Sequence, residues 1–281
     1  MGGKKMLVNL QEIMKFAEEK EIAIGAFNTP CFESLCAVIE MAEYKKIPVI
    51  IEHAEVHFPC GPLDQIGPAM VDFARRAKVP VCVHLDHGTS MRVLEQAVEL
   101  GFTSVMFDGS ALSYGENKKQ TKKAVEYVHQ HGVSLEAELG CMATAGSRQG
   151  NYTDPALAVD FVSETGIDAL AIAFGTAHGI YPQAPVLNFD IINQVKKAAD
   201  LPLVMHGGSG VDDKDYVKAI KQGIRKINYY SYMGAGAYQK ALEYGREHPE
   251  NSRLFQELSK VAVDTMKGYL DHIMDVFYRL K

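Results

Sequence analysis

Short apolar segments alternate with amphipathic segments along nearly the whole chain. The apolar segments are rich in Val, Ile, Leu and Ala and show little polar alternation, which is typical of parallel strands covered on both faces. We expect strands at 22–28, 48–54, 80–87, 103–110, 134–140, 168–175, 201–208 and 225–231.

The segments between these strands have helical periodicity. Several of them, such as "SMRVLEQAVELG" and "KDYVKAIKQG", end in Gly, the residue best suited to a left-handed helix C-cap. About eight strand–helix units in 281 residues predict an α/β protein, a (β/α)8 TIM barrel. An open doubly wound sheet is the main alternative, but no Gly-rich dinucleotide-binding turn follows the first strand.

Helical segments also flank the expected barrel. A helix over about 10–20 would cap the bottom of the barrel, and the amphipathic tail from 251 predicts one or two extra C-terminal helices packed outside. No linker-like stretch divides the chain, so we expect a single domain over 1–281.

Composition narrows the classes of protein. The chain is 47% hydrophobic and 23% charged, with a net charge of -6, which is typical of a globular protein without a basic surface for nucleic acid or anionic membranes. No apolar run approaches the roughly 18 residues of a membrane helix, and the start lacks the apolar stretch of a signal peptide. Five cysteines without paired spacing argue against a disulfide framework. We therefore predict a cytoplasmic protein.

Three histidines lie at matching ends of the expected strands. His87 ends the third strand, His178 follows the sixth and His206 ends the seventh, and each precedes a Gly. The C-terminal ends of barrel strands meet at one face, where barrel enzymes build their active sites. A lone strand-end histidine is commonly structural, but three converging imidazoles with an open fourth position predict a catalytic zinc. His84 is excluded because it points away from His87 on the same strand.

Glycine-rich turns follow the last two strands. The "HGGSG" segment at 206–210 and the "NYYS" segment at 228–231 lie where barrels often bind phosphate. Gly207, Gly208 and Ser209 would supply amides and a hydroxyl, and Asn228 and Ser231 the opposite side. The alternative is a glycine turn that only leads into the next helix.

A set of spaced motifs covers most of the chain. The segments "GAFN", "HLDHG", "DGS", "EAELG", "GTAHGIY", "PLVMHGGSG" and "KIN" occur in this order between 25 and 228. Together they resemble the class II, zinc-dependent ketose-phosphate aldolases, which include fructose-bisphosphate and tagatose-bisphosphate aldolases. The resemblance implies a lyase of carbohydrate metabolism that acts on a sugar phosphate and forms a homodimer or homotetramer.

The resemblance also implies roles for individual residues. Zn²⁺ would be bound by the three histidines, with Na⁺ or K⁺ as a further cation near the phosphate. Asp86 would be the catalytic acid/base, and Gly179 and Asn28 would join the residues that bind phosphate and substrate. Asp86 could instead orient a ligand histidine. Glu136 and Glu138, which point to one side of the fifth strand, fit that orienting role or an alternate metal position.

Several positions depart from the family pattern. The family carries an acid on a long loop after the "EAELG" strand, but 141–152 contains no Asp or Glu, and Asp154 looks like a helix cap. Ala54 replaces a common Ser. Tyr230 replaces an acid linked to fructose-bisphosphate selection, and Gly234 replaces a basic residue that meets the distal phosphate. Tyr230 is therefore a candidate specificity residue, with buried barrel packing as the alternative.

The preferred function is a zinc-dependent aldolase that reversibly cleaves a ketose phosphate to a glycerone-phosphate-type enediolate and an aldehyde. Fructose 1,6-bisphosphate is not expected to be its best substrate. One alternative is a catalytically weakened member that binds metal and sugar phosphate in a regulatory role, which the missing loop acid favours. Another is a zinc hydrolase on the same fold, which would leave "HGGSG" unexplained.

Overall fold

Eight parallel strands form the closed barrel in the computed structural model, which describes residues 6–140, 143–144, 152–250 and 254–280. In chain order the barrel strands are β2 (Ile24–Asn28), β3 (Val49–Ala54), β4 (Val81–Gly88), β5 (Ser104–Phe107), β6 (Ser134–Leu139), β8 (Ala169–Ile172), β10 (Leu203–Met205) and β11 (Ile224–Tyr229). Each pairs with its neighbours in this order, and β11 pairs with β2 to close the ring. The predicted TIM barrel and its eight strands are confirmed.

Three short strands lie outside the ring. The strand β1 (Leu7–Val8) pairs with β4 in parallel. The strands β7 (Ala143–Thr144) and β9 (Ala177–His178) pair with each other beyond the ends of β6 and β8. This second pairing places His178 over the C-terminal face of the barrel.

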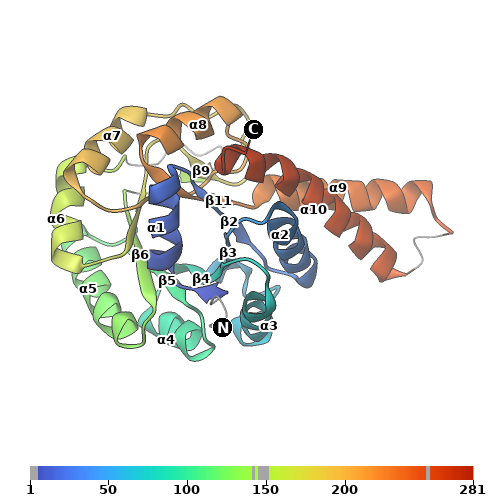
Figure 1. Ribbon diagram of the computed structural model, residues 1–281, viewed down its shortest axis with the longest axis horizontal. Helices are drawn as coiled ribbons and strands as arrows, with labels where there is room; N and C mark the ends of the chain where they lie inside the picture. The colour runs from blue at the N-terminus through green and yellow to red at the C-terminus, as the bar shows by residue number, and fades with distance from the viewer. Residues whose placement is uncertain (1–5, 141–142, 145–151, 251–253, 281) are drawn as a thin grey trace.

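Helices surround the strands, as Figure 1 shows. They are α2 (Phe32–Lys45), α3 (Leu63–Arg76), α4 (Met91–Glu99), α5 (Tyr114–Gln130), α6 (Pro155–Thr165), α7 (Phe189–Ala198) and α8 (Asp213–Gln222), with a 3-10 turn η1 (Glu55–His57) after β3. The helix α1 (Leu10–Lys20) closes the bottom, as predicted. Its Gln11 backbone N–H donates to Oγ of Ser134, the first residue of β6.

The C-terminal helices are arranged in an unexpected way. The helix α9 (Ser231–Glu247) follows β11 but projects from the barrel, and α10 (Phe255–Phe277) returns beside it (Figure 1). The end of α10 then packs against α2 and α8, so α10 completes the helical ring. Phe277 is fully buried there, and the Tyr278 hydroxyl accepts a hydrogen bond from the Gly25 backbone. The expected C-terminal helices are confirmed, although one of them serves as a barrel helix.

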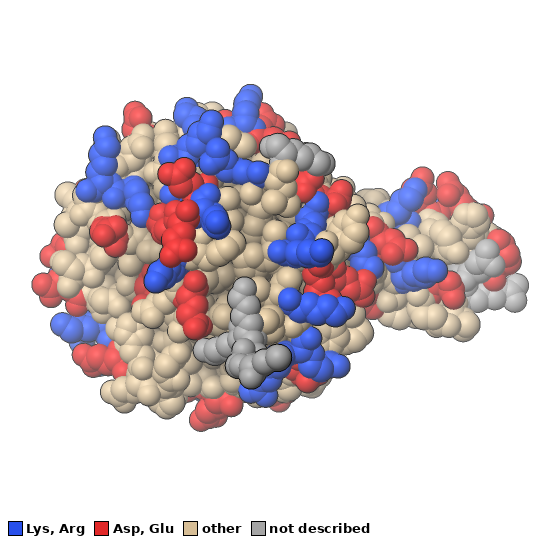
Figure 2. Space-filling model, in the orientation of Figure 1, with Lys and Arg blue, Asp and Glu red and all other residues tan. Residues whose placement is uncertain are grey.

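Charges are spread over the visible surface. Figure 2 shows basic and acidic side chains interspersed over the barrel and the projecting helices, without a broad patch of one sign on this face. Among the described residues, no helix is long and apolar enough to span a bilayer.

Candidate active site and metal centre

A cavity of about 420 Å³ opens at the C-terminal face of the barrel. It contains most of the residues that the sequence predicted to be functional. These lining residues are Asn28, Asp86, His87, Glu138, His178, Gly179, Gly207, Gly208, Ser209, Asn228, Tyr230 and Ser231. His206 and Glu136 are fully buried and do not line it. The fold therefore brings the predicted residues of distant segments together.

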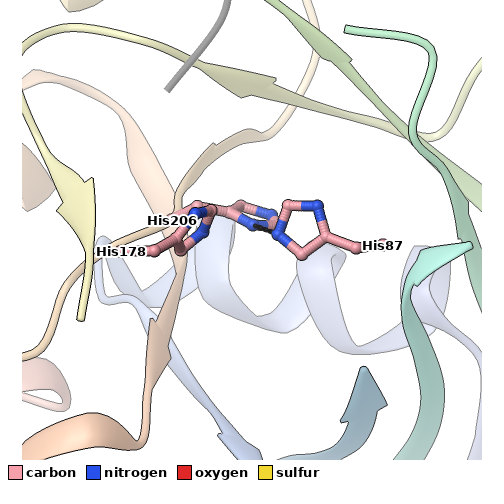
Figure 3. Close-up of side chains that lie close together, drawn as sticks. All are labelled: His87, His178 and His206. Carbon is pink, nitrogen blue, oxygen red and sulfur yellow. Dashed lines mark hydrogen bonds between the residues drawn. The ribbon is translucent and has the colours of Figure 1, made fainter. Parts of the chain in front are cut away.

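The three predicted ligand histidines converge on one point. One nitrogen from each of His87, His178 and His206 lies within 4.8 Å of the others. Figure 3 shows the rings facing one another, with His87 entering from the end of β4 opposite His178 and His206. The closest pair is Nε2 of His87 and Nδ1 of His206, 2.9 Å apart. His87 has a positive φ of 48°, which is rare for a non-glycine residue and turns its ring toward the other two.

Carboxylates orient two of these rings. Nδ1–H of His87 donates to Oδ2 of Asp108 at 2.7 Å, and Nε2–H of His206 donates to Oε1 of Glu136 at 2.7 Å. These bonds leave the facing nitrogens, Nε2 of His87 and Nδ1 of His206, as lone-pair donors. Two lone pairs 2.9 Å apart repel unless a proton or metal ion lies between them. Imidazoles held by carboxylates in this way are characteristic of zinc sites, so the donor set fits the metal.

The ionisation of the rings agrees with this arrangement. Burial lowers the pKa of His178 to about 3, and burial also lowers that of His206. Both rings are therefore neutral and can coordinate a cation. Burial lowers the pKa of His87 too, but the charge of Asp86 and the bond to Asp108 outweigh it and raise the pKa to about 10. In the metal-free protein a proton thus occupies the position between His87 and His206.

Asp86 is held beside the histidines by two amides. Nδ2 of Asn28 donates to Oδ2 of Asp86 at 2.9 Å, and Nδ2 of Asn228 donates to Oδ1 at 3.2 Å. Burial raises the pKa of Asp86, but His87, His206 and Lys226 hold it well below its usual range. The carboxylate is therefore ionised, 3.8 Å from Nε2 of His87, and points into the cavity floor. Both of its proposed roles, acid/base and orienting group, are compatible with this position.

A buried charge network lies beneath the cavity. Nζ of Lys226 is 2.9 Å from Oε2 of Glu136 and 3.4 Å from Oε2 of Glu52, and all three side chains are fully buried. Lys226 keeps the pKa of Glu136 low against burial, whereas burial and Asp86 raise the pKa of Glu52 well above its usual range. Glu136 is thus an anion that joins Lys226 to His206, while Glu52 accepts a hydrogen bond from Nδ2 of Asn28 at 2.9 Å.

The predicted phosphate-binding segments form a tightly packed cradle. A Cβ at Gly207 would lie 2.5 Å from the Ala177 carbonyl oxygen, and Gly207 has a φ of +61°. A Cβ at Gly208 would lie 2.6 Å from the Asn228 carbonyl oxygen. Only glycine fits these two positions, so the "HGG" turn is a structural requirement, and the Gly208 N–H donates to the Asn228 carbonyl at 3.2 Å. Ser231 begins α9, and a helix N-terminus favours an anion.

Sequence reasoning missed several residues that support the site. Asp108, which orients His87, lies in the "DGS" motif, and Lys226 is the first residue of "KIN". The motifs could therefore have indicated both residues. The sequence offers only a weak indication that Glu52 belongs to the site, namely a carboxylate within an apolar strand. Tyr181 is the last residue of the "GTAHGIY" motif; its hydroxyl accepts from the Ala177 N–H at 2.7 Å and donates to the Gly207 carbonyl at 2.8 Å, joining two cavity loops.

Other expectations concern the loop after β6. The stretch 141–152, where the family's loop acid is missing, lies outside the described residues except for 143–144 and 152. Asp154 does cap α6, as expected, by accepting hydrogen bonds from the backbone of Ala156 and Leu157. His84 points away from the other histidines, to Ser104 at 2.7 Å. The roles of the individual site residues remain predictions.

Known proteins resemble this chain in both amino-acid sequence and architecture. The chain is 40% identical over 236 residues to the uncharacterized protein YdjI of Escherichia coli K12, which covers 81% of this chain and 84% of that protein. It superimposes on the crystal structure of the YdjI aldolase with a TM-score of 0.85, 35% identity and 97% coverage of both chains. A putative fructose-1,6-biphosphate aldolase from Coccidioides immitis gives a TM-score of 0.85 at 27% identity, with 96% of each chain covered. The family model for class II fructose-bisphosphate aldolases matches residues 8–279. On these grounds the chain belongs to the class II fructose-bisphosphate aldolase family.

Proposed function

We propose that the protein is a zinc-dependent aldolase that reversibly cleaves a ketose phosphate to a glycerone-phosphate-type enediolate and an aldehyde. The observation that carries this proposal is the convergence of three histidines, two of them oriented by carboxylates, beside an ionised Asp86 that lines the cavity. His87, His178 and His206 would hold the metal. Bound Zn²⁺ supplies a Lewis acid for a substrate carbonyl oxygen, which is worth several kcal/mol.

Other residues of this chain would bind the phosphate and accept the proton whose removal starts the cleavage. Gly179, Gly207, Ser209 and Ser231 would hold the phosphate with backbone amides, hydroxyls and the α9 N-terminus. Asp86 would accept the proton of the hydroxyl that becomes the aldehyde carbonyl. As the carbon–carbon bond breaks, its electron pair stays with the ketone-derived fragment, giving the enediolate. A positioned carboxylate contributes on the order of 10²–10⁴-fold to such a proton transfer.

Asn28 and Asn228 have a positioning role in this scheme, because both amides fix the Asp86 carboxylate. Oδ1 of Asn28 accepts a hydrogen bond from the Ala54 backbone N–H at 3.0 Å, so both ends of this amide already have partners within the protein. In contrast, Oδ1 of Asn228 is buried without a hydrogen-bond partner. That oxygen is suited to accept a hydrogen bond from a substrate hydroxyl.

The experiment that tests this function needs no knowledge of the aldehyde. The zinc-loaded protein is incubated with dihydroxyacetone phosphate in deuterated water, and C–H exchange is followed by NMR with and without a chelator. Chelator-sensitive exchange is expected. Its absence in protein with bound zinc would favour the alternative of a weakened member that binds metal and sugar phosphate. The Asp86→Asn variant is the matched control, because Asp86 acts on the aldehyde-forming hydroxyl and is not required for exchange.

The assembly and surroundings of the enzyme are part of the same proposal. We expect a cytoplasmic homodimer or homotetramer with a monovalent cation, Na⁺ or K⁺, near the phosphate. The projecting helices expose Tyr238 and Phe255, which are 61% and 74% accessible and offer apolar surface for a second copy. Light scattering of the purified protein would determine the subunit number.

A further inference from the structure

The barrel order separates the two ends of the cavity. The phosphate-binding residues come from loops after β9, β10 and β11, whereas η1 follows β3. In the ring of eight strands, β3 lies opposite β8, the strand that precedes β9. Val56 and His57 of η1 line the same cavity as Gly179 and Gly207. A substrate held by its phosphate in the glycine cradle therefore extends its other end toward η1.

The cavity offers no cation for a second phosphate. Among the described residues that line it there is no Lys or Arg, while Asp86, Asp108 and Glu138 contribute carboxylates. Phosphate groups in proteins are bound by Arg, by Lys or by helix N-termini, because an unpaired dianion is costly to desolvate. The N-terminus of α9, at Ser231, is taken by the first phosphate in the proposed function, so the described lining residues leave no cationic side chain for a second one.

His57 contributes an unused polar group at this end. Its Nδ1 is buried and has no hydrogen-bond partner. Buried imidazole nitrogens are normally paired, so an unpaired one in a cavity wall indicates a missing ligand group. Burial lowers the pKa of His57, so the ring is neutral and provides one N–H donor and one nitrogen acceptor. That combination matches a hydroxyl, which also donates and accepts.

Tyr230 occupies the space that a larger residue at 234 would need. A Cβ on Gly234 would lie 3.1 Å from Cζ and 3.2 Å from Oη of Tyr230. The tyrosine ring also packs edge-on against His57, with ring centroids 5.3 Å apart. Tyr230 and Gly234, which both differ from the family pattern, are therefore coupled: the tyrosine ring fills the space beside residue 234, and the glycine there leaves room for the ring. The result is a wall of neutral polar rings.

We propose that His57 and Tyr230 determine specificity by recognising an uncharged, hydroxylated end of the aldehyde portion of the substrate, and that the site disfavours a second phosphate there. This inference rests on the proposed aldolase function. The substrate class it names is a ketose phosphate with a single phosphate and a neutral polyol tail.

The test measures aldol addition of dihydroxyacetone phosphate to two matched pairs of aldehydes. These are D-glyceraldehyde with D-glyceraldehyde 3-phosphate, and D-erythrose with D-erythrose 4-phosphate. The uncharged member of each pair should have a kcat/KM higher by on the order of tenfold or more. Preference for the phosphorylated members would overturn the inference while leaving the aldolase function intact. Failure of deuterium exchange as well would contradict the proposed function, and the inference would fall with it.

Variants separate recognition from folding. His57→Leu should lower kcat/KM for the uncharged aldehydes relative to the exchange rate by roughly 3- to 10-fold, the effect of one lost neutral hydrogen bond. His57→Asn, which restores a donor and an acceptor, should recover part of that ratio. An unchanged ratio in His57→Leu would remove His57 from recognition.

A gain of function tests the relationship between 230 and 234. Gly234→Arg combined with Tyr230→Ala should shift preference toward the phosphorylated aldehydes, because it supplies a cation and the room for it. Gly234→Arg alone should not, because Tyr230 occupies that space. Equal shifts in the single and double variants would contradict the steric part of the proposal.

Discussion

Nε2–H of His206 donates to Oε1 of Glu136 at 2.7 Å, and the other oxygen of the same carboxylate meets Lys226 at 2.9 Å. One fully buried carboxylate therefore connects a metal-ligand candidate to the only cation that the described residues place in this network. The bond to Glu136 decides which nitrogen of His206 faces His87. The pair with Lys226 decides that Glu136 is an anion.

We expect Glu136→Gln to lower zinc affinity about 10- to 100-fold, because the carboxylate that orients His206 is lost. It should also lower the free energy of unfolding by about 3–5 kcal/mol, because Lys226 loses its closest partner. Adding Lys226→Met should recover stability without recovering zinc affinity. Metal titration and urea unfolding measure the two effects. The exposed pair Arg76 and Asp72 is the control, since its removal should change stability by at most about 1 kcal/mol.

His206→Ala should abolish metal binding and aldol cleavage together, because it removes one of three converging ligands. Zinc content by elemental analysis and the chelator-sensitive exchange provide the two measurements. His131→Ala, at the exposed residue that follows α5, is the matched control and should behave as the parent protein. Full zinc occupancy in His206→Ala would show that the ligand assignment is wrong.

Asp86→Asn should retain the fold and zinc but reduce aldol cleavage by on the order of 10²–10⁴-fold, because the amide cannot take the hydroxyl proton. Exchange of dihydroxyacetone phosphate should persist in the same variant. Near-normal cleavage would exclude Asp86 as the acid/base and leave it the role of orienting its neighbours.

The metal-free protein should become less stable as the pH rises through about 10, the value to which Asp86 and Asp108 raise the pKa of His87 against the effect of burial. The sign follows from linkage. The pKa of His87 is higher in the folded protein than the ordinary value of 6.5, so the protonated ring stabilises the fold fully below pH 6.5. This stabilisation is lost as the pH rises through about 10, the pKa in the folded protein. Urea unfolding of chelated protein at several pH values measures this. His87→Gln should flatten the dependence, and an equal slope in both proteins would contradict the assignment.

Gly207→Ala should damage the phosphate cradle, because its Cβ would meet the Ala177 carbonyl and its φ of +61° disfavours alanine. We expect weaker binding of dihydroxyacetone phosphate together with lower thermal stability. Gly268→Ala is the contrasting control. It lies within α10 with open space around its position, and should stabilise the protein by about 0.5–1 kcal/mol. Unchanged phosphate binding in Gly207→Ala would remove this turn from the site.

The sequence alone was sufficient to predict the barrel and most of the cavity residues. Strand–helix alternation determines parallel pairing, and parallel pairing collects the strand ends carrying His87, Asp86 and His206 at one face. The motifs then indicated the family, which the comparisons confirm. These properties follow from local patterns and chain order.

Only the tertiary structure decided which atoms face one another at the candidate metal site, what lies beneath that site and which side chains line each end of the cavity. Asp108, Glu136 and Lys226 act through side-chain contacts between different strands, and those distances are not encoded in any single segment. The packing of Tyr230 over Gly234 and against His57 is likewise set by three separate elements. Periodicity determines which face a residue occupies, whereas hydrogen bonding and steric exclusion across the barrel determine what it can do there.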